Sequence, residues 1–196
     1  MLGLRVDRLS NYFEVIKMSA TYKMTIAGIE RELPLCEVSP TLDIAAFIIF
    51  GDVELTIAGC AALLEKSPEF DVILTPEAKS IPIAYELSRQ SGKPYVVARK
   101  GTKVYMKNPI SVSVRSITTA HDQKLYLGED EVNIINGKRV LIVDDVISTG
   151  ESLAAVRELV KAAGGIEAAS CAFLAEGDAS EREDIIFLEP LPIFPK

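Results

Sequence analysis

The stretch VLIVDDVISTGES, residues 140–152, joins an apolar run to two adjacent carboxylates and then to a small, hydroxyl-rich loop. Val140–Val143 are all apolar, which is typical of a strand buried on both faces of a parallel sheet. Ser148, Thr149 and Gly150 can open a helix. In open α/β sheets, ligands bind outside the carboxyl ends of the strands. The stretch therefore predicts a strand, a helix and a binding site at the turn between them.

Strand and helix patterns alternate along the rest of the chain. Helical spacing of apolar residues marks three segments, and short apolar runs mark the strands between them. The expected helices are 52–67, with Asp52 as N-cap, 80–92, ending at Gly92, and 151–165; further expected strands are 71–75, 94–100 and 166–177. This alternation predicts an α/β fold with a doubly wound, mostly parallel sheet flanked by helices.

The two ends of the chain have a different pattern. Residues 22–50 contain short strand-like runs broken by Gly28 and Pro40, which predicts a small β-rich cap. The tail, residues 184–196, is expected to be extended, because its prolines cannot continue a helix.

Composition narrows the class of protein. A chain of 196 residues, 48% of them hydrophobic, suggests one domain with a substantial core. The net charge of −7 argues against a nucleic-acid surface, because phosphate backbones are bound by clustered Lys and Arg. Three widely spaced cysteines predict neither a disulfide framework nor a zinc site. His121 is the only histidine, which excludes a histidine-rich metal site and argues against a Ser-His-Asp triad. We expect His121 to be an exposed loop residue.

The sequence also predicts that the protein does not enter a membrane. Its first residues lack the basic and apolar run of a secretory signal. The most apolar segment, residues 44–64, contains Asp52 and Glu54. Each acid near the centre of a span would cost about 2.5 to 3.5 kcal/mol on insertion scales. We therefore expect a soluble, cytoplasmic protein.

The loop after the apolar run has the composition of a phosphate site. Gly150 allows a close approach, and backbone N–H groups at a helix N-terminus can cradle a phosphate. Hydroxyl groups of Ser148, Thr149 and Ser152 would assist. The chain has neither the G-x-x-x-x-G-K-[ST] nor the G-x-G-x-x-G pattern, which disfavours nucleoside triphosphates and dinucleotides. The alternative is an ordinary helix N-cap.

Asp144 and Asp145 directly precede this loop. Carboxylates beside a phosphate pocket are useful where they meet hydroxyl groups or a cation. A ribose that carries a 5′-phosphate supplies both the phosphate and the hydroxyls. The alternative is a pair of exposed acids at a strand end with no role in binding.

VLIVDDVISTGES resembles the phosphoribosyl pyrophosphate motif of type I phosphoribosyltransferases. The resemblance implies that Asp144 and Asp145 hold the ribose hydroxyls. It implies that the purine packs on Val146, for which an ordinary core valine is the alternative. The 5′-phosphate would be bound by Ser148, Thr149, Gly150, Glu151 and Ser152. Mg²⁺ is the implied cofactor, held through substrate and water or directly by Asp144 or Asp145.

A second loop, TPEAKSIPIA at residues 75–84, resembles the pyrophosphate loop of the adenine and xanthine branch. In that branch the turn can contain a cis non-proline peptide. The strand-end run VVARKGTK adds three cations that the same families use near pyrophosphate. The implied pyrophosphate set is Glu77, Ala78, Lys79, Ser80, Arg99, Lys100 and Lys103, and the implied catalytic set is Asp144, Asp145, Lys79 and Arg99. For Lys79 the alternative is a solvated loop lysine.

Residues 103–137 alternate weakly between polar and apolar, as a long hairpin or arm would, and resemble the loop that closes over substrates in these enzymes. Adenine-specific members often carry a glutamate there, whereas residues 111–120 have none, so the general acid stays unassigned.

The resemblance implies a single phosphoribosyltransferase domain over residues 1–196. Its core would be about 52–183, and its hood about 1–50 plus the tail 184–196, with Phe47, Phe50, Phe187 and Phe194 as candidate hood or core aromatics. The implied reaction joins a purine, adenine first and xanthine second, to phosphoribosyl pyrophosphate in purine salvage, in a homodimer. The alternative is a non-catalytic regulator that senses phosphoribosyl pyrophosphate.

Overall fold

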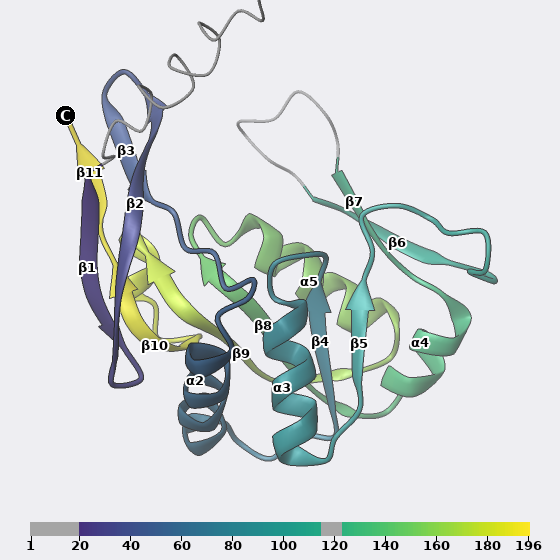
Figure 1. Cartoon of the computed structure of the whole chain (residues 1–196). Coiled ribbons are helices and arrows are strands. Elements are labelled where there is room, and N and C mark those ends of the chain that lie inside the picture. Colours follow the sequence, from purple (N-terminus) through teal and green to yellow (C-terminus); the bar gives the residue numbers. More distant parts are fainter. Residues whose placement is uncertain (1–19, 115–122) are drawn as a thin grey trace, which may run out of the picture.

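The computed structural model describes residues 20–114 and 123–196. Its centre is a five-stranded sheet in the order β10-β9-β8-β4-β5, in which every neighbouring pair is parallel (Figure 1). These strands are β4 Val72–Pro76, β5 Tyr95–Ala98, β8 Arg139–Ile147, β9 Ile166–Glu176 and β10 Ile186–Leu191. The prediction of a parallel, doubly wound sheet is confirmed.

Helices cover both faces of this sheet (Figure 1). The helices are α2 Val53–Lys66, α3 Ile81–Ser91, α4 Glu129–Ile135 and α5 Glu151–Ala162. Side chains alternate along each strand, so Leu141 packs with α2 and α3 while Ile142 packs with α5. Both faces of β8 are thus apolar, which explains its unbroken hydrophobic run.

Local signals place the ends of two helices where the sequence expects them. The Asp52 carboxylate accepts a hydrogen bond from the Leu55 N–H at 3.1 Å, so Asp52 is the N-cap of α2. Gly92 ends α3 in the left-handed conformation, with φ at +69°. The same Asp52 carboxylate receives Arg31 from the hood side at 2.6 Å. The helix cap therefore also ties the hood to the core.

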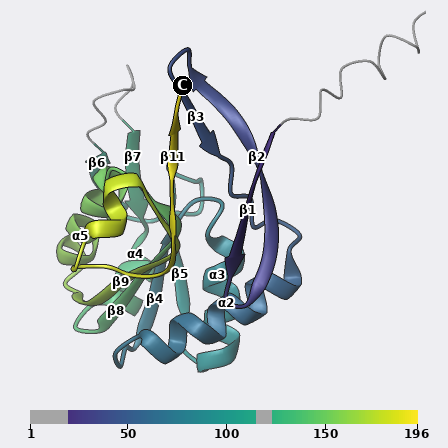
Figure 2. The ribbon, with the colours of Figure 1, turned by 90° about the vertical axis from the view of Figure 1, so that its left-hand side faces the viewer.

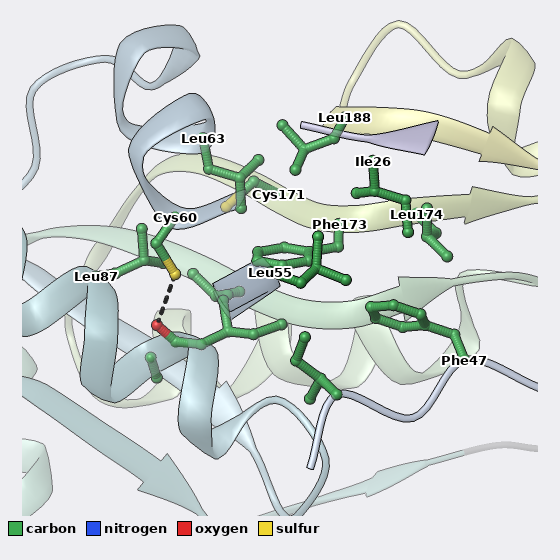
Figure 3. Close-up of a cluster of buried hydrophobic side chains, with 14 of the residues drawn as sticks. Ile26, Phe47, Leu55, Cys60, Leu63, Leu87, Cys171, Phe173, Leu174 and Leu188 are labelled. Carbon is green, nitrogen blue, oxygen red and sulfur yellow. Dashed lines mark hydrogen bonds between the residues drawn. The ribbon is translucent and has the colours of Figure 1, made fainter. Parts of the chain in front are cut away.

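Phe173 of β9 lies at the centre of the core beneath α2 (Figure 3). A Cβ placed on Gly59 of α2 would lie 2.3 Å from its ring, so only glycine permits this close approach. The Phe47 ring lies 6.2 Å from the Phe173 ring, centroid to centroid, and Phe47 is buried. Phe47 is therefore a core residue.

A second, antiparallel sheet forms the hood, in the order β1-β2-β3-β11 (Figure 2). Its strands are β1 Thr21–Ile26, β2 Ile29–Ser39, β3 Leu42–Ala45 and β11 Ile193–Pro195. The predicted cap is present, although its last strand ends at Ala45 instead of near Phe50. Residues 46–50 belong to no strand and cross to α2, although the Ala46 N–H still donates to the Pro34 carbonyl of β2 at 2.9 Å. Phe50 is exposed, and Phe194 packs edge-on against Tyr22 at 5.2 Å.

The C-terminal tail is divided between the two sheets, whereas the sequence assigned all of residues 184–196 to the hood. β10 pairs in parallel with β9 at the edge of the core sheet, and Phe187 packs on the α5 side. After Pro192, β11 pairs antiparallel with β3 of the hood. The tail is extended as predicted, but pairing with distant strands decides which part joins which sheet.

The arm contains a hairpin, as predicted. β6 Ile110–Val114 pairs antiparallel with β7 Gln123–Leu127, while residues 115–122, including His121, lie outside the described part. Helix α4, which follows, was not expected; Glu129, Asp130 and Glu131 in its first turn favour the helix N-terminus. No helix in the described ranges is long and apolar enough to cross a membrane. The cytoplasmic location stays a prediction.

Candidate active site

The predicted site residues meet at the carboxyl edge of the core sheet. β4 and β8 are adjacent and parallel, so the loops that follow them lie side by side. A cavity of about 410 Å³ opens between them, within the usual size of small-molecule sites, about 300–1,000 Å³. Its lining consists of Pro76, Glu77, Ala78, Lys79, Lys100, Leu125, Asp144, Asp145, Val146 and Ser152. Two loops that are more than 60 residues apart in the sequence thus share one cavity.

The paired acids lie within β8, because its pairing with β9 continues to Ile147. Asp145 is only 4% exposed, and its carboxylate receives the Lys79 ammonium at 2.5 Å. The Asp145 N–H donates to the Asp144 carboxylate at 2.9 Å. Lys79 is therefore paired with Asp145, although its side chain is 47% exposed.

Asp144 is the carboxylic acid of the site with a strongly raised pKa. Burial, followed by the neighbouring Asp145 carboxylate, raises the pKa of Asp144 to about 7, although the hydrogen bond from the Asp145 N–H acts in the opposite direction. Cations and hydroxyl donors favour the ionised form of a carboxylate. A ligand that brings such groups would therefore bind with release of a proton.

The loop after β4 is built around Ser80. The Ser80 hydroxyl accepts a hydrogen bond from the Thr75 hydroxyl at 2.7 Å and donates to the Pro76 carbonyl at 3.2 Å. Ser80 is 1% exposed, so it shapes the loop from inside. The Glu77–Ala78 peptide bond is cis, the geometry that the family resemblance allows at this turn.

Glu77 anchors the neighbouring cations. Its carboxylate accepts the Lys100 N–H at 3.0 Å and lies 3.5 Å from the Arg99 guanidinium. These groups lower the pKa of Glu77, with the Lys100 N–H as the main cause. A carboxylate repels pyrophosphate, so this geometry favours a role in holding the cations and not a direct contact. Arg99 also donates to the Tyr105 hydroxyl at 2.9 Å.

The predicted cationic side chains differ in whether they line the cavity. Lys100 and Lys79 line the cavity, and its described lining does not include Arg99 or Lys103. The backbone of Arg99 exchanges two hydrogen bonds with Tyr126 of β7, at 2.8 and 2.9 Å, so the arm is fastened to the end of β5. Leu125 of the same strand lines the cavity. Leu125 was not among the expected site residues because the arm as a whole is weakly patterned, although Leu125 and Leu127 alternate as buried strand residues do.

The second loop leads into α5. Gly150, with φ at +82°, occupies the N-cap position, and because it has no side chain it cannot cap the helix as serine would. Ser148, Thr149 and Ser152 are exposed, and Ser152 lines the cavity. The Glu151 N–H in the first turn donates to the Thr149 hydroxyl at 3.5 Å. A helix N-terminus beside exposed hydroxyls is the arrangement that an anion site uses. Val146 lines the cavity, as a residue that contacts a purine would, and it also packs against the core, as an ordinary core valine would.

Several phosphoribosyltransferases have sequences similar to part of this chain. An adenine phosphoribosyltransferase of Thermotoga petrophila is 37% identical over 108 residues, which cover 55% of this chain and 60% of that protein. A hypoxanthine/guanine phosphoribosyltransferase of Methanocella arvoryzae is 40% identical over 105 residues, 53% of this chain and 51% of that protein. The chain thus matches between about half and three fifths of the length of these two relatives.

Solved structures share the fold. The adenine phosphoribosyltransferase of Thermoanaerobacter pseudethanolicus superposes with a TM-score of 0.62 at 24% identity, over 90% of this chain and 98% of that chain. The Trypanosoma brucei enzyme, solved with AMP, pyrophosphate and ribose-5-phosphate, gives 0.62 at 16% identity, over 94% and 79%. The model of the phosphoribosyl transferase domain matches residues 52–190. Because this match spans most of the 196 residues, the chain belongs to the phosphoribosyl transferase domain family.

Proposed function

We propose that the protein is a purine phosphoribosyltransferase. It transfers the 5-phosphoribosyl group from phosphoribosyl pyrophosphate to a purine base and releases pyrophosphate. The observation that carries this proposal is the contact between Lys79 and Asp145 at 2.5 Å. This contact joins the loop proposed for pyrophosphate to the strand proposed for ribose, as a substrate with both groups requires.

The proposed reaction separates charge. Cleavage at the anomeric carbon leaves positive charge on the ribose ring and negative charge on the departing pyrophosphate. Lys79 and Lys100 line the cavity and are suited to stabilise that negative charge, with Arg99 behind them. Holding the base and the ribose in one cavity contributes through positioning. Catalysis in this proposal needs no nucleophilic side chain.

Lys79 has two successive partners in this proposal. Without substrate, its ammonium group neutralises the Asp145 carboxylate. Pyrophosphate oxygens then compete for Lys79, which frees Asp145 to accept hydrogen bonds from the ribose hydroxyls. Binding of the two halves of the substrate is therefore coupled through a single ion pair.

Magnesium is the proposed cofactor, and the acid pair fits it. Mg²⁺ keeps several waters and uses one or two carboxylates together with substrate oxygens. The described residues contain no group of three or more His, Cys, Asp or Glu side chains that could hold a metal, so a closed protein cage is not formed there. Asp144 and Asp145 would be its protein ligands. When bound, the ion would offset the charge of pyrophosphate.

Adenine is the proposed base, with xanthine next. The relatives at 33–37% identity include adenine phosphoribosyltransferases, and others at 36–40% are hypoxanthine/guanine enzymes. Val146 lines the cavity and offers an apolar surface for a purine ring. That surface does not distinguish among purines, so the choice of base is left to assay.

We also propose a homodimer. Val53 and Tyr85, from α2 and α3, are 67% and 57% exposed and line an apolar hollow of about 430 Å³ with Ile57. Contiguous apolar surface of this kind commonly marks an interface. Sedimentation should give twice the mass of 21.3 kDa, and Val53→Asp should shift it toward the monomer. A monomeric wild-type protein would refute the proposal.

The test of the main proposal is pyrophosphate release from phosphoribosyl pyrophosphate and Mg²⁺, with adenine, xanthine, hypoxanthine and guanine supplied separately. Lys79→Ala should lower turnover at least tenfold, whereas Lys93→Ala, an exposed lysine before β5 at the opposite edge of the sheet, should not. Binding of phosphoribosyl pyrophosphate without turnover on any base would contradict the enzyme and favour a sensor. Equal activity of both variants would contradict the role of Lys79.

A further inference from the structure

Arg182 reaches the proposed phosphate loop from a distant part of the chain. It follows the short 3₁₀ helix Gly177–Glu181, which begins where β9 ends. Its Nη1 lies so near Gly150 that a Cβ on that glycine would be 2.2 Å from it. Gly150 therefore admits the guanidinium as well as permitting its own left-handed φ of +82°.

A network of charged groups holds Arg182 in this position. Its Nε donates to Asp184 Oδ1 at 2.8 Å and its Nη2 donates to Asp184 Oδ2 at 2.7 Å. Asp184 also receives Arg157 Nη1 of α5 at 2.7 Å, and Arg157 in turn donates to Glu167 at 2.9 Å. The pairing with Asp184 uses the Nε and Nη2 edge of the Arg182 guanidinium. It leaves Nη1 directed toward Gly150.

The charge at this loop makes a nearby cation useful. Residues 148–152 contain Glu151 and neither Lys nor Arg. A phosphate monoester carries about −1.5 to −2 charges at pH 7. Guanidinium groups match phosphate in both charge and geometry, and hydrogen bonds to charged groups are stronger than neutral ones. The Arg182 side chain is 29% exposed, so a ligand in the loop can reach it.

We propose that Arg182 binds the 5′-phosphate of the substrate through Nη1, together with the amides and hydroxyls of residues 148–152. This inference rests on the proposed function, since it deepens the assignment of the loop. It makes Arg182 a determinant of selectivity for 5′-phosphorylated ribose. Pyrophosphate, bound near Lys79, does not depend on it.

The test measures the dissociation constants of ribose 5-phosphate and of pyrophosphate with Mg²⁺ by calorimetry. Arg182→Met should weaken ribose 5-phosphate by about tenfold to 100-fold, the range for losing a charge-assisted hydrogen bond, and leave pyrophosphate unchanged. Arg139→Met is the matched control. Arg139 is also held by an acid, Asp71, at 3.0 and 3.1 Å, but at the amino end of β8. That variant should bind both ligands as the wild type does.

The outcomes separate the inference from the proposed function. Unchanged ribose 5-phosphate affinity in Arg182→Met would overturn the inference. Equal losses of affinity for ribose 5-phosphate and pyrophosphate would also overturn it, because they would indicate that Arg182 has only a structural role. Failure of the wild type to bind either ribose 5-phosphate or phosphoribosyl pyrophosphate would overturn the proposed function itself. If Arg182→Met does not fold, Arg182→Lys can be used instead, because it keeps the positive charge but removes the planar guanidinium group with its paired donors. It should weaken ribose 5-phosphate alone by severalfold, and no change would refute the inference.

Discussion

The ion pair between Lys79 and Asp145 offers a quantitative test of the site. Lys79→Met removes the partner of a carboxylate that is only 4% exposed. Loss of one partner from a fully buried pair costs about 3–5 kcal/mol. The Lys79 side chain is 47% exposed, so water and salt reduce this cost, and we expect about 1–3 kcal/mol.

The pair is best measured by a double-mutant cycle. Urea denaturation without substrate would give the free energy of unfolding of the wild type, Lys79→Met, Asp145→Asn and the double variant. Asp145→Asn should cost less than Lys79→Met, because it leaves a solvated ammonium and removes the repulsion with Asp144. The double variant should be more stable than Lys79→Met alone, with a coupling energy of about 1 kcal/mol or more. Additive effects of the two substitutions would refute the pairing.

Three further predictions concern the core and the acid pair. Gly59→Ala places a Cβ 2.3 Å from Phe173, so unfolding should become easier by about 1–3 kcal/mol. Thermal denaturation checks this, and an unchanged midpoint would contradict the packing of α2 on β9. The folded state raises the pKa of Asp144 to about 7 from about 3.9 in the unfolded chain, so it binds more protons between those values. The substrate-free protein should therefore lose stability as pH rises through this window, and Asp144→Asn should flatten that part of the urea-denaturation profile; a profile equal to the wild type would be the contrary result. The double variant Asp144→Asn/Asp145→Asn should weaken binding of phosphoribosyl pyrophosphate in calorimetry without unfolding the protein. Unchanged affinity at equal thermal stability would exclude the ribose assignment.

Local patterns were sufficient to predict the elements that carry the site. The apolar run before Asp144 specifies a strand buried on both faces, and Gly150 marks the start of α5. Asp52 and Gly92 mark helix ends because capping depends on neighbouring residues in the sequence. The order of these signals was enough to predict a parallel sheet with its site at the carboxyl edge.

Features that depend on distant contacts were not predictable in this way. Nothing near Pro192 in the sequence shows that the strand before it joins β9 and the strand after it joins β3. The role of Glu77 as an anchor for cations depends on Arg99 and Lys100, more than 20 residues away. Arg182 was overlooked because its position opposite the phosphate loop results from the fold of β9 and its following turn.

The division of the C-terminal segment determines how the hood and the core sheet can move relative to each other. The polypeptide passes between them at residues 46–52 and again at Pro192, and Arg31 bridges them to Asp52 at 2.6 Å. Hinges in proteins are a few loop or element-terminal residues that absorb backbone rotation. Because Pro192 alone separates β10 from β11, a large displacement of the hood along the core sheet would have to break the pairing of β11 with β3 or of β10 with β9 (Figure 1).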